Sequence, residues 1–405
     1  MAAACKRLDE CFAVIAAMRA RCRRPGRRHI GGRLNRFGVS PASTLYDVAR
    51  EAGVSTATVS RVVHGLDRVR PSTRARVLEA IEALGYVPDS AAQSMIRQRK
   101  EVIGLLAVES RSPDTDVEQQ GLLFIEEVLR GVESSLGEIE WSLLIALLRD
   151  DDPAGAYRRM QKISAKVDGL LIAEGIVSSE HLARVAARVP VVLVAGSPGE
   201  PHADVFGADN RAGTRALVGH LVEEHGRTRL FGIAGPPEAP DAQERRSALE
   251  EAVAGHPGAV LAGSFQGWFA AMSGQLAVRE ILTRPRRDRP DAIVCANDQM
   301  AIGAIRELQM AGVRVPADIA VVGFDDMHAG ALLMPPLTTV RQPMRLLGER
   351  ACARLLQRIA QPALPRHVER LPAELVIRES CGCSAQPPRQ PGLARAGHEQ
   401  AITSG

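Results

Sequence analysis

The chain has 405 residues, of which 45% are hydrophobic and 24% charged, and its formal net charge is +4. This length favours two or three folded units over one, and the composition is ordinary for a soluble globular protein. No run approaches the roughly 20 apolar residues of a membrane span. The apolar stretch Phe12–Met18 is too short for a convincing signal peptide. The sequence therefore predicts a cytoplasmic protein with no membrane role.

Charge is unevenly distributed along the chain. Residues 1–100 hold 19 Lys/Arg against 8 Asp/Glu, whereas residues 101–405 hold 32 against 39. A basic end on a mildly acidic body is typical of a protein that presents one end to nucleic-acid phosphates. Residues 1–43 are basic and glycine-rich, which predicts a disordered extension. Two interpretations of the extension stay open: a segment that contacts phosphates non-specifically, and a wrongly assigned start codon.

The cysteines argue against a secreted disulfide framework, because their number is odd and they are scattered. They are Cys5, Cys11, Cys22, Cys295, Cys352, Cys381 and Cys383. The pair Cys381 and Cys383 could indicate metal or redox chemistry. No further Cys/His cluster along the sequence completes a zinc site, so we expect no metal and no cofactor.

Residues 44–63, TLYDVAREAGVSTATVSRVV, predict a helix-turn-helix. Thr44 suits the cap of a helix over Leu45–Ala52, Gly53 ends that helix, and Ser55 starts a second one that runs through Val63. In such a unit the second helix lies in the DNA major groove. An ordinary helical hairpin within an enzyme is the alternative interpretation.

The side chains of this motif fall into two sets with different predicted roles. The first can form the small core that sets the angle between the helices: Leu45, Val48, Ala49, Val54, Val59 and Val62. The second is predicted to contact DNA: Thr44, Tyr46, Ser55, Thr56, Ala57, Thr58, Ser60, Arg61 and His64. Arg61 can reach phosphate or guanine, whereas Ala57 can read only a thymine methyl group or a steric fit.

The motif resembles the DNA-binding head of the lactose/galactose-repressor family of bacterial transcription regulators. The next segment, VRPSTRARVLEAIEALGYVPDSAAQSM at 69–95, strengthens the resemblance. Pro71 suits a helix start and Gly85 a helix end, so we expect a DNA-binding domain over 44–89. Residues 90–100 follow as a hinge and linker. Ser90–Ile96 is similar to the family's hinge helix, and Met95 replaces a leucine that wedges into the minor groove.

From residue 101 apolar runs alternate with amphipathic helices. The predicted strands are Val102–Val108, Ser142–Leu148, Gly169–Ala173, Val191–Ala195, Leu230–Ala234, Ala259–Ala262, Ala292–Ala296 and Ile319–Phe324. The predicted helices are Leu122–Leu136, Pro153–Ser164, Ala212–Glu224, Asp241–Val253, Met272–Leu282 and Gln299–Ala311. This alternation indicates α/β architecture with two doubly wound parallel-sheet lobes over 101–380. A ligand would bind beyond the carboxyl ends of the strands, in the cleft between the lobes.

The resemblance covers about residues 44–380 and is strongest in CANDQMAIGAIRELQMAGVRVPADIAVVGFDD at 295–326. It implies a periplasmic-binding-protein-like fold in which the chain recrosses near Leu337–Gln342, so that each lobe is discontinuous. It also implies these effector-binding residues: Arg215, Phe269, Asn297, Asp325 and Gln342. Carboxylate, amide and guanidinium groups would bind hydroxyls, and the aromatic ring a flat apolar face.

Three further points concern the cleft and the end of the chain. Asp298 is as suited to cap the helix over Gln299–Ala311 as to bind a ligand. The loops Glu109–Gln120 and Glu174–Ser179 should face the cleft, but they depart from the family pattern. Residues 381–405 contain several prolines and no leucine heptad, which predicts a disordered tail and a homodimer.

These features predict a transcription regulator of the repressor type. It would bind a double-stranded DNA operator as a homodimer and respond to a small carbohydrate-like effector. The alternative is a sugar-binding transport-type protein without a DNA role. We do not expect an enzyme, because the sequence contains no Walker-type loop and no nucleophile elbow.

Overall fold

The computed structural model describes residues 43–63, 69–86, 99–109, 122–137, 139, 141–149, 152–173 and 177–384. The chain divides between Gln93 and Ser94 into two compact units. The predicted hinge helix, nearly all of the predicted amino-terminal extension and nearly all of the tail lie outside the described residues. The same holds for residues 110–120 and 174–176 of the two loops expected at the cleft.

The first unit contains the predicted helix-turn-helix and one further helix. Its elements are α2 (Leu45–Glu51), α3 (Thr56–Val63) and α4 (Pro71–Leu84). All six predicted core residues pack together, joined by Val77 and Ala80 of α4. Gly85 ends α4 in the left-handed region at φ +56°, where glycine carries no side-chain penalty.

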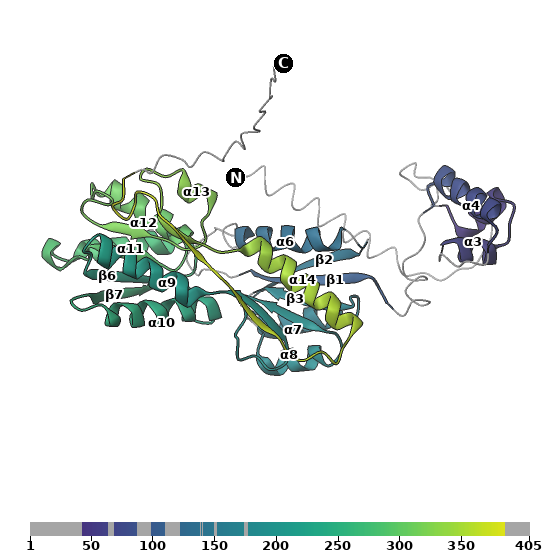
Figure 1. Cartoon of the computed structure of the whole chain (residues 1–405), viewed down its shortest axis with the longest axis horizontal. Helices are drawn as coiled ribbons and strands as arrows, with labels where there is room; N and C mark the ends of the chain where they lie inside the picture. The colour runs from purple at the N-terminus through teal and green to yellow at the C-terminus, as the bar shows by residue number, and fades with distance from the viewer. Residues whose placement is uncertain are drawn as a thin grey trace, which may run out of the picture. The chain divides into compact units, whose positions relative to one another are not determined.

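The second unit begins with a lobe built on a six-stranded parallel sheet. The strands lie in the order β11 (Val368–Leu371), β5 (Asp204–Ala208), β4 (Val191–Val194), β3 (Gly169–Ala173), β1 (Val102–Glu109), β2 (Ser142–Arg149). Leu105 faces a core with α6 (Leu122–Leu136) and α14 (Met344–Ala360). Its neighbour Leu106 faces the opposite core, with α7 (Pro153–Ser164) and α8 (Ser179–Ala186). Figure 1 shows helices on both faces of this sheet.

The second lobe has a four-stranded parallel sheet. Its order is β7 (Val260–Gln266), β6 (Arg229–Ala234), β8 (Ala292–Cys295), β9 (Ala320–Val322). One core includes α9 (Asn210–Gly219), the π-helical turn η1 (His220–Glu224) and α10 (Pro240–Gly255). The opposite core includes α11 (Ala271–Thr283) and α12 (Asp298–Met310). The 3-10 turn η2 (Arg286–Asp288) and α13 (His328–Ala331) complete the lobe.

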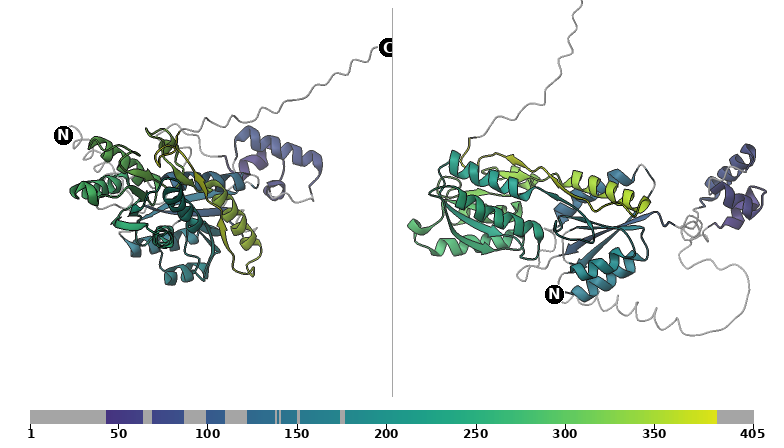
Figure 2. Two further views of the ribbon diagram at one scale, coloured as in Figure 1. Left: turned by 60° about the vertical axis from the view of Figure 1, so that its left-hand side comes forward. Right: turned by 60° about the horizontal axis from the view of Figure 1, so that its bottom comes forward.

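The chain crosses between the lobes more than once. After β9 it forms β10 (Thr339–Arg341), enters the first lobe as α14 and β11, and returns as β12 (Glu374–Val376). β10 and β12 pair antiparallel, and both ribbons run from one lobe to the other (Figures 1 and 2). The implied recrossing near Leu337–Gln342 and the discontinuity of the lobes are confirmed.

Most predicted elements match the structure to within two residues at each end, and two differ by more. The predicted helix Ala212–Glu224 begins at Asn210 as α9 and changes to π-helix at His220. The predicted strand Ala259–Ala262 is β7, which continues to Gln266. Because β7 is an edge strand and half exposed, its later residues lack the continuous apolar pattern on which the prediction depended. None of the described helices is both long and apolar enough to cross a membrane.

Candidate DNA-binding head and effector cleft

The head begins with two closely capped helices. Thr44 Oγ1 accepts a hydrogen bond from Asp47 N at 3.3 Å, and the Thr44 amide donates to Asp47 Oδ2 at 3.0 Å. This reciprocal capping box satisfies backbone groups at the start of α2. Ser55 Oγ accepts from Thr58 N at 3.2 Å, as expected of a cap for α3. Gly53 lies between the helices at φ +62°, so the turn depends on glycine.

The predicted DNA contacts differ in exposure. Ala57 and Arg61 are exposed on α3, and Thr56 and Ser60 are half-buried beside them. Tyr46 on α2 is 76% exposed, although it is a large aromatic residue. Thr44, Ser55 and Thr58 are occupied in capping. His64 and Met95 lie outside the described residues.

A cavity of about 720 Å³ lies in the second unit, with walls from both lobes and the crossover. Phe124, Glu126 and Glu127 of α6 line it from the first lobe, as does Ala195 after β4. Four of the five predicted effector residues line it as well: Phe269, Asn297, Asp325 and Gln342. Asn297 follows β8 and Asp325 lies beyond β9, so the cavity is at the carboxyl ends of strands, as predicted.

Asp325 is held in an uncommon backbone conformation at the cavity wall. Its φ is +125°, a region that residues other than glycine occupy at a cost and often at functional sites. The Asp325 amide donates to Val340 O on the crossover at 2.7 Å. Its carboxylate accepts from Gln342 Nε2 at 2.5 Å. The carboxylate is therefore anchored to the crossover strand and presented to the cavity.

Asn297 and Phe269 are joined to each other. Asn297 Nδ2 donates to Phe269 O at 3.0 Å, and Asn297 Oδ1 accepts from Met300 N at 3.0 Å. Asn297 is thus the cap of α12, which corrects the expectation that Asp298 could cap it. Asp298 instead accepts from Thr339 Oγ1 at 2.5 Å and from Met327 N at 2.7 Å. Because both of its carboxylate oxygens are occupied and it is fully buried, Asp298 holds the crossover to the lobe.

Arg215, the fifth residue predicted to bind the effector, does not line the cavity, so this prediction was wrong. It is exposed on α9, where it faces away from the buried side that carries Thr214 and Leu217. The guanidinium in the cleft comes from Arg245 of α10, which is 5% exposed. Arg245 Nε donates to Asn210 Oδ1 at 2.8 Å and its Nη1 to Ala296 O at 2.6 Å.

Arg245 lies between two carboxylates. Its Nη1 is 3.7 Å from Asp325 Oδ1, and its Nη2 is 3.6 Å from Asp241 Oδ2. The guanidinium carbon also lies 3.9 Å from the centre of the Phe324 ring, a cation–π distance. Asp241 and Arg245 are four residues apart on one helix, and this spacing of opposite charges after a buried strand could have revealed both from the sequence.

Burial dominates the electrostatics of the cleft. It raises the pKa of Asp325 to about 6, although Arg245 and the hydrogen bond from Gln342 oppose the shift. Burial likewise raises the pKa of Asp241, against the attraction of Arg245. Among the described residues, Asp241 Oδ1 and Gln342 Oε1 are buried without a hydrogen-bond partner. Both residues line the cavity, so a polar ligand could satisfy these atoms.

A group that could hold a metal ion lies apart from the cleft in the described chain: His220, His225, Cys381 and Cys383. It corrects the expectation that no Cys/His cluster completes a site at the cysteine pair. The histidines were missed because His220 and Cys381 are 161 positions apart in the sequence and meet only in the fold.

Known proteins resemble both units of the chain. Residues 44–89 match the lacI family of bacterial regulatory proteins, and residues 218–381 match the periplasmic binding protein-like domain. The HTH-type transcriptional repressor PurR of Aliivibrio salmonicida is 32% identical over 84% of this chain and 98% of its own length. The ribose operon repressor of Escherichia coli K12 is 33% identical over 84% of this chain and 99% of its own.

Solved structures give the same result. The lac repressor dimer bound to operator and the anti-inducer ONPF matches with a TM-score of 0.74 and 30% identity, over 84% of this chain and 99% of that one. The complex of the transcriptional regulator CelR with cellobiose matches with a TM-score of 0.61 and 31% identity, over 84% and 99% of the two chains.

A helix-turn-helix head followed by a two-lobed body with a cleft defines a ligand-responsive, DNA-binding transcription regulator. The chain belongs to the lacI family of bacterial regulatory proteins. It is a DNA-binding transcriptional repressor with an effector-binding body, as predicted. The alternative of a transport-type protein without a DNA role is set aside.

Proposed function

We propose that this protein represses transcription by binding an operator as a homodimer and that a hydroxyl-rich small molecule, a sugar or sugar derivative, controls this binding. The observation that carries the effector proposal is the cleft itself. It combines buried carboxylates, a buried guanidinium and an amide with two polar atoms that have no partner among the described residues.

Different cleft residues bind different groups of the sugar in this proposal. The Asp325 carboxylate and Gln342 Oε1 accept hydrogen bonds from sugar hydroxyls, and Arg245 donates to their oxygens. Phe269 and Phe124 supply apolar faces for the ring carbons. Two relatives support this chemistry, because one is named for the ribose operon and the other was solved with cellobiose.

On the DNA side, we assign base and phosphate contacts to the exposed face of α3. Arg61 and Ala57 are its most accessible predicted positions, with Thr56 and Ser60 beside them. Thr44 and Tyr46 at the start of α2 reach phosphates, as do Ser55 and Thr58 while they cap α3. His64 and the hinge residue Met95 complete the proposed contacts. Homodimerisation would place two α3 helices on two operator half-sites.

The protein acts by binding rather than by catalysis, and in the cytoplasm, where the operator is. The support is that the relatives are repressors. The effector acts only if it binds the DNA-competent and DNA-released states with unequal affinity.

Selection of duplexes from a random pool tests the DNA function directly. We expect a two-fold symmetric sequence that the full chain binds far more tightly than a shuffled duplex, and absence of any preference would contradict the proposal.

The selected duplex then serves as the probe for the effector. Fluorescence anisotropy measures the affinity of the protein for this duplex in the presence of each member of a panel of sugars, sugar phosphates, nucleosides and amino acids. We expect at least one sugar to change that affinity. A response confined to non-sugars would overturn the effector class while leaving the operator function standing.

A further inference from the structure

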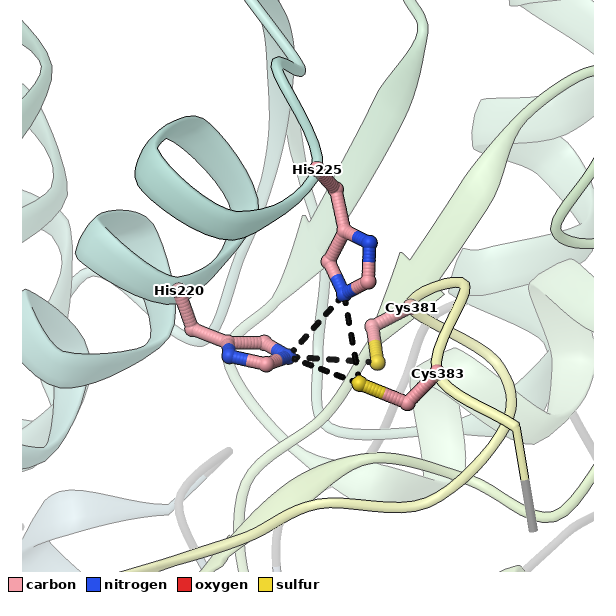
Figure 3. Close-up of side chains that lie close together, drawn as sticks. All are labelled: His220, His225, Cys381 and Cys383. Atoms are coloured by element: carbon pink, nitrogen blue, oxygen red, sulfur yellow. Dashed lines mark hydrogen bonds between the residues drawn. The ribbon is translucent and has the colours of Figure 1, made fainter.

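Four metal-ligating side chains converge in the second lobe, and none of them lines the cleft cavity. His220 begins the π-helical turn η1 after α9 and His225 directly follows that turn, whereas Cys381 and Cys383 lie in the segment after β12. Figure 3 shows all four side chains pointing toward a common centre. Cys381 is fully buried and the other three are half-buried, so the site is shielded but reachable.

The separations between the ligand atoms suit a tetrahedral metal ion. His220 Nε2 lies 3.2 Å from His225 Nε2, 3.3 Å from Cys381 Sγ and 3.6 Å from Cys383 Sγ. Cys383 Sγ lies 3.4 Å from His225 Nε2, and all four atoms are within 4.8 Å of one another. Zinc with bonds of about 2.0 Å to nitrogen and about 2.3 Å to sulfur requires edges of about 3.3–3.8 Å.

Hydrogen bonding alone satisfies this group poorly. An imidazole Nε2 carries either one proton or one lone pair, yet His220 Nε2 has three polar neighbours at close range. One cation at the centre would receive all four lone pairs at once. Thr338 Oγ1 lies 3.1 Å from Cys381 Sγ, and such a hydroxyl donor orients a thiolate ligand.

Two local features place the ligands. On an α-helix, residues five apart point about 140° away from each other. The wider π-helical turn over His220–Glu224, with His225 directly after it, brings the two histidine rings closer together. Between the cysteines, Gly382 has φ +123°. A Cβ at Gly382 would lie 3.1 Å from His225 Nδ1, so a larger residue would be strained and would press on the histidine ring.

We propose that His220, His225, Cys381 and Cys383 form a structural Cys2His2 zinc site. Two thiolates and two imidazoles in tetrahedral arrangement are the ligand set of structural zinc, and with four protein ligands no position is left open for catalysis. The ion would fasten the segment after β12 to the end of α9. That segment already lies against the sheet, because Ser380 Oγ donates to Val321 O at 2.6 Å and accepts from Thr338 N at 2.8 Å.

Metal content of the full chain tests the proposal. Protein purified without chelator or affinity-tag metal should contain about one zinc per protomer by elemental analysis. Cys383→Ser and His225→Ala should each reduce the zinc content to that of a chelator-treated sample. His202→Ala removes an exposed histidine of the first lobe, between β4 and β5, and should keep the full zinc content. Zinc content that is unchanged in both ligand variants would overturn the proposal.

Wild-type protein supplies a test that does not depend on the folding of a variant. Cobalt added to the chelator-treated chain should give the visible absorption of a tetrahedral thiolate complex, and zinc should abolish it. Chelation should lower the melting temperature and added zinc should restore it, because a ligand of the native state stabilises by mass action. No cobalt–thiolate absorption, or a disulfide between Cys381 and Cys383 in the freshly purified protein, would refute the zinc site.

Discussion

At the scale of single residues, Arg245 organises the effector cleft. Its guanidinium is buried, contacts Asn210 and Ala296 O, and lies between the carboxylates of Asp241 and Asp325. A buried charge with one partner removed is strongly destabilising. The cleft is therefore a coupled group of charges, and a ligand that binds one member changes the environment of the others.

Asp325→Ala should abolish the effector response while leaving operator binding intact. The substitution removes the carboxylate that accepts from Gln342 and faces the cavity. We expect effector affinity measured by calorimetry to fall at least about tenfold, the typical effect of a hydrogen bond to a charged group. Asp318→Asn, an exposed carboxylate paired with Arg314, serves as the control and should bind normally. Full-strength effector binding by Asp325→Ala would refute the assignment.

Effector affinity should fall as the pH is lowered through the pKa of Asp325. Burial raises that pKa to about 6, so the carboxylate is mostly ionised at pH 7.5 and mostly protonated at pH 5. The neutral acid is a weaker acceptor for a sugar hydroxyl. Calorimetry across this range should show the loss, and Asp325→Asn should show a smaller one, because Asp241 still titrates in the cavity. A wild-type profile no steeper than that of Asp325→Asn would contradict the prediction.

Arg61→Ala should weaken operator binding about tenfold to a hundredfold. Arg61 is exposed on α3 and can reach guanine or phosphate. The matched control is Arg76→Ala, an arginine exposed on α4, which should at most reduce affinity for all duplexes alike. Anisotropy on operator and shuffled duplexes separates the two effects. Unchanged operator affinity in Arg61→Ala would exclude the assignment.

At the scale of elements, burial determined what the sequence could predict. The strands β1, β3, β6 and β8 have continuous apolar runs because both faces of their sheets are covered, and all were predicted. α14 and the short strands β5, β10, β11 and β12 were not predicted individually. α14, β10 and β11 contain arginines, and β5 and β12 are only five and three residues long, so none shows a sustained apolar run. The pairing of β10, β11 and β12 is set by partners distant in sequence.

The cleft, too, could be predicted only in part from the sequence. Strand-end position together with the family resemblance located four of the five predicted residues. The first-lobe wall required the fold, whereas the spacing of Asp241 and Arg245 was a sequence signal that the prediction did not use. On α9 a shift of one residue changes the face by about 100°. Arg215 is therefore exposed, whereas its neighbour Thr214 is buried.

Asp204 joins α14 to the first-lobe sheet, and its ionisation should stabilise the fold against acid. Burial alone would raise its pKa, but hydrogen bonds from Arg358 and Arg354 outweigh burial and lower it. The stabilisation is thus complete above the unfolded-state pKa of about 3.9 and is lost as the pH falls through the lower folded-state pKa.

Asp204→Asn should reduce the free energy of unfolding by about 3–5 kcal/mol, because it leaves two nearly buried arginines without their charge partner. Urea unfolding at pH 7 measures the loss. The wild-type advantage over the variant should shrink as the pH is lowered below about 4. A constant difference between pH 7 and pH 3 would contradict the linkage.

At the scale of the whole molecule, the hinge connects DNA recognition to the body. We predict that Ser90–Ile96 becomes helical on operator DNA and that Met95 inserts between base pairs and kinks the duplex. Met95→Ala should weaken operator binding far more than non-specific binding, and Met95→Leu should bind as well as wild type or better, because leucine loses less rotamer freedom. Electrophoretic bend-angle measurements test this, and equal bends for wild type and Met95→Ala would exclude insertion.

The interleaved path of the chain has a consequence for biosynthesis. α2 to α4 are complete once residue 84 has been made, whereas the first lobe awaits α14 and β11 and the second lobe awaits Ser380 against Val321. On a ribosome that adds about 5–20 residues per second, the head can fold many seconds before either half of the body can close. A transcript that ends early would then yield a chain with a finished DNA-binding head and no effector-responsive body.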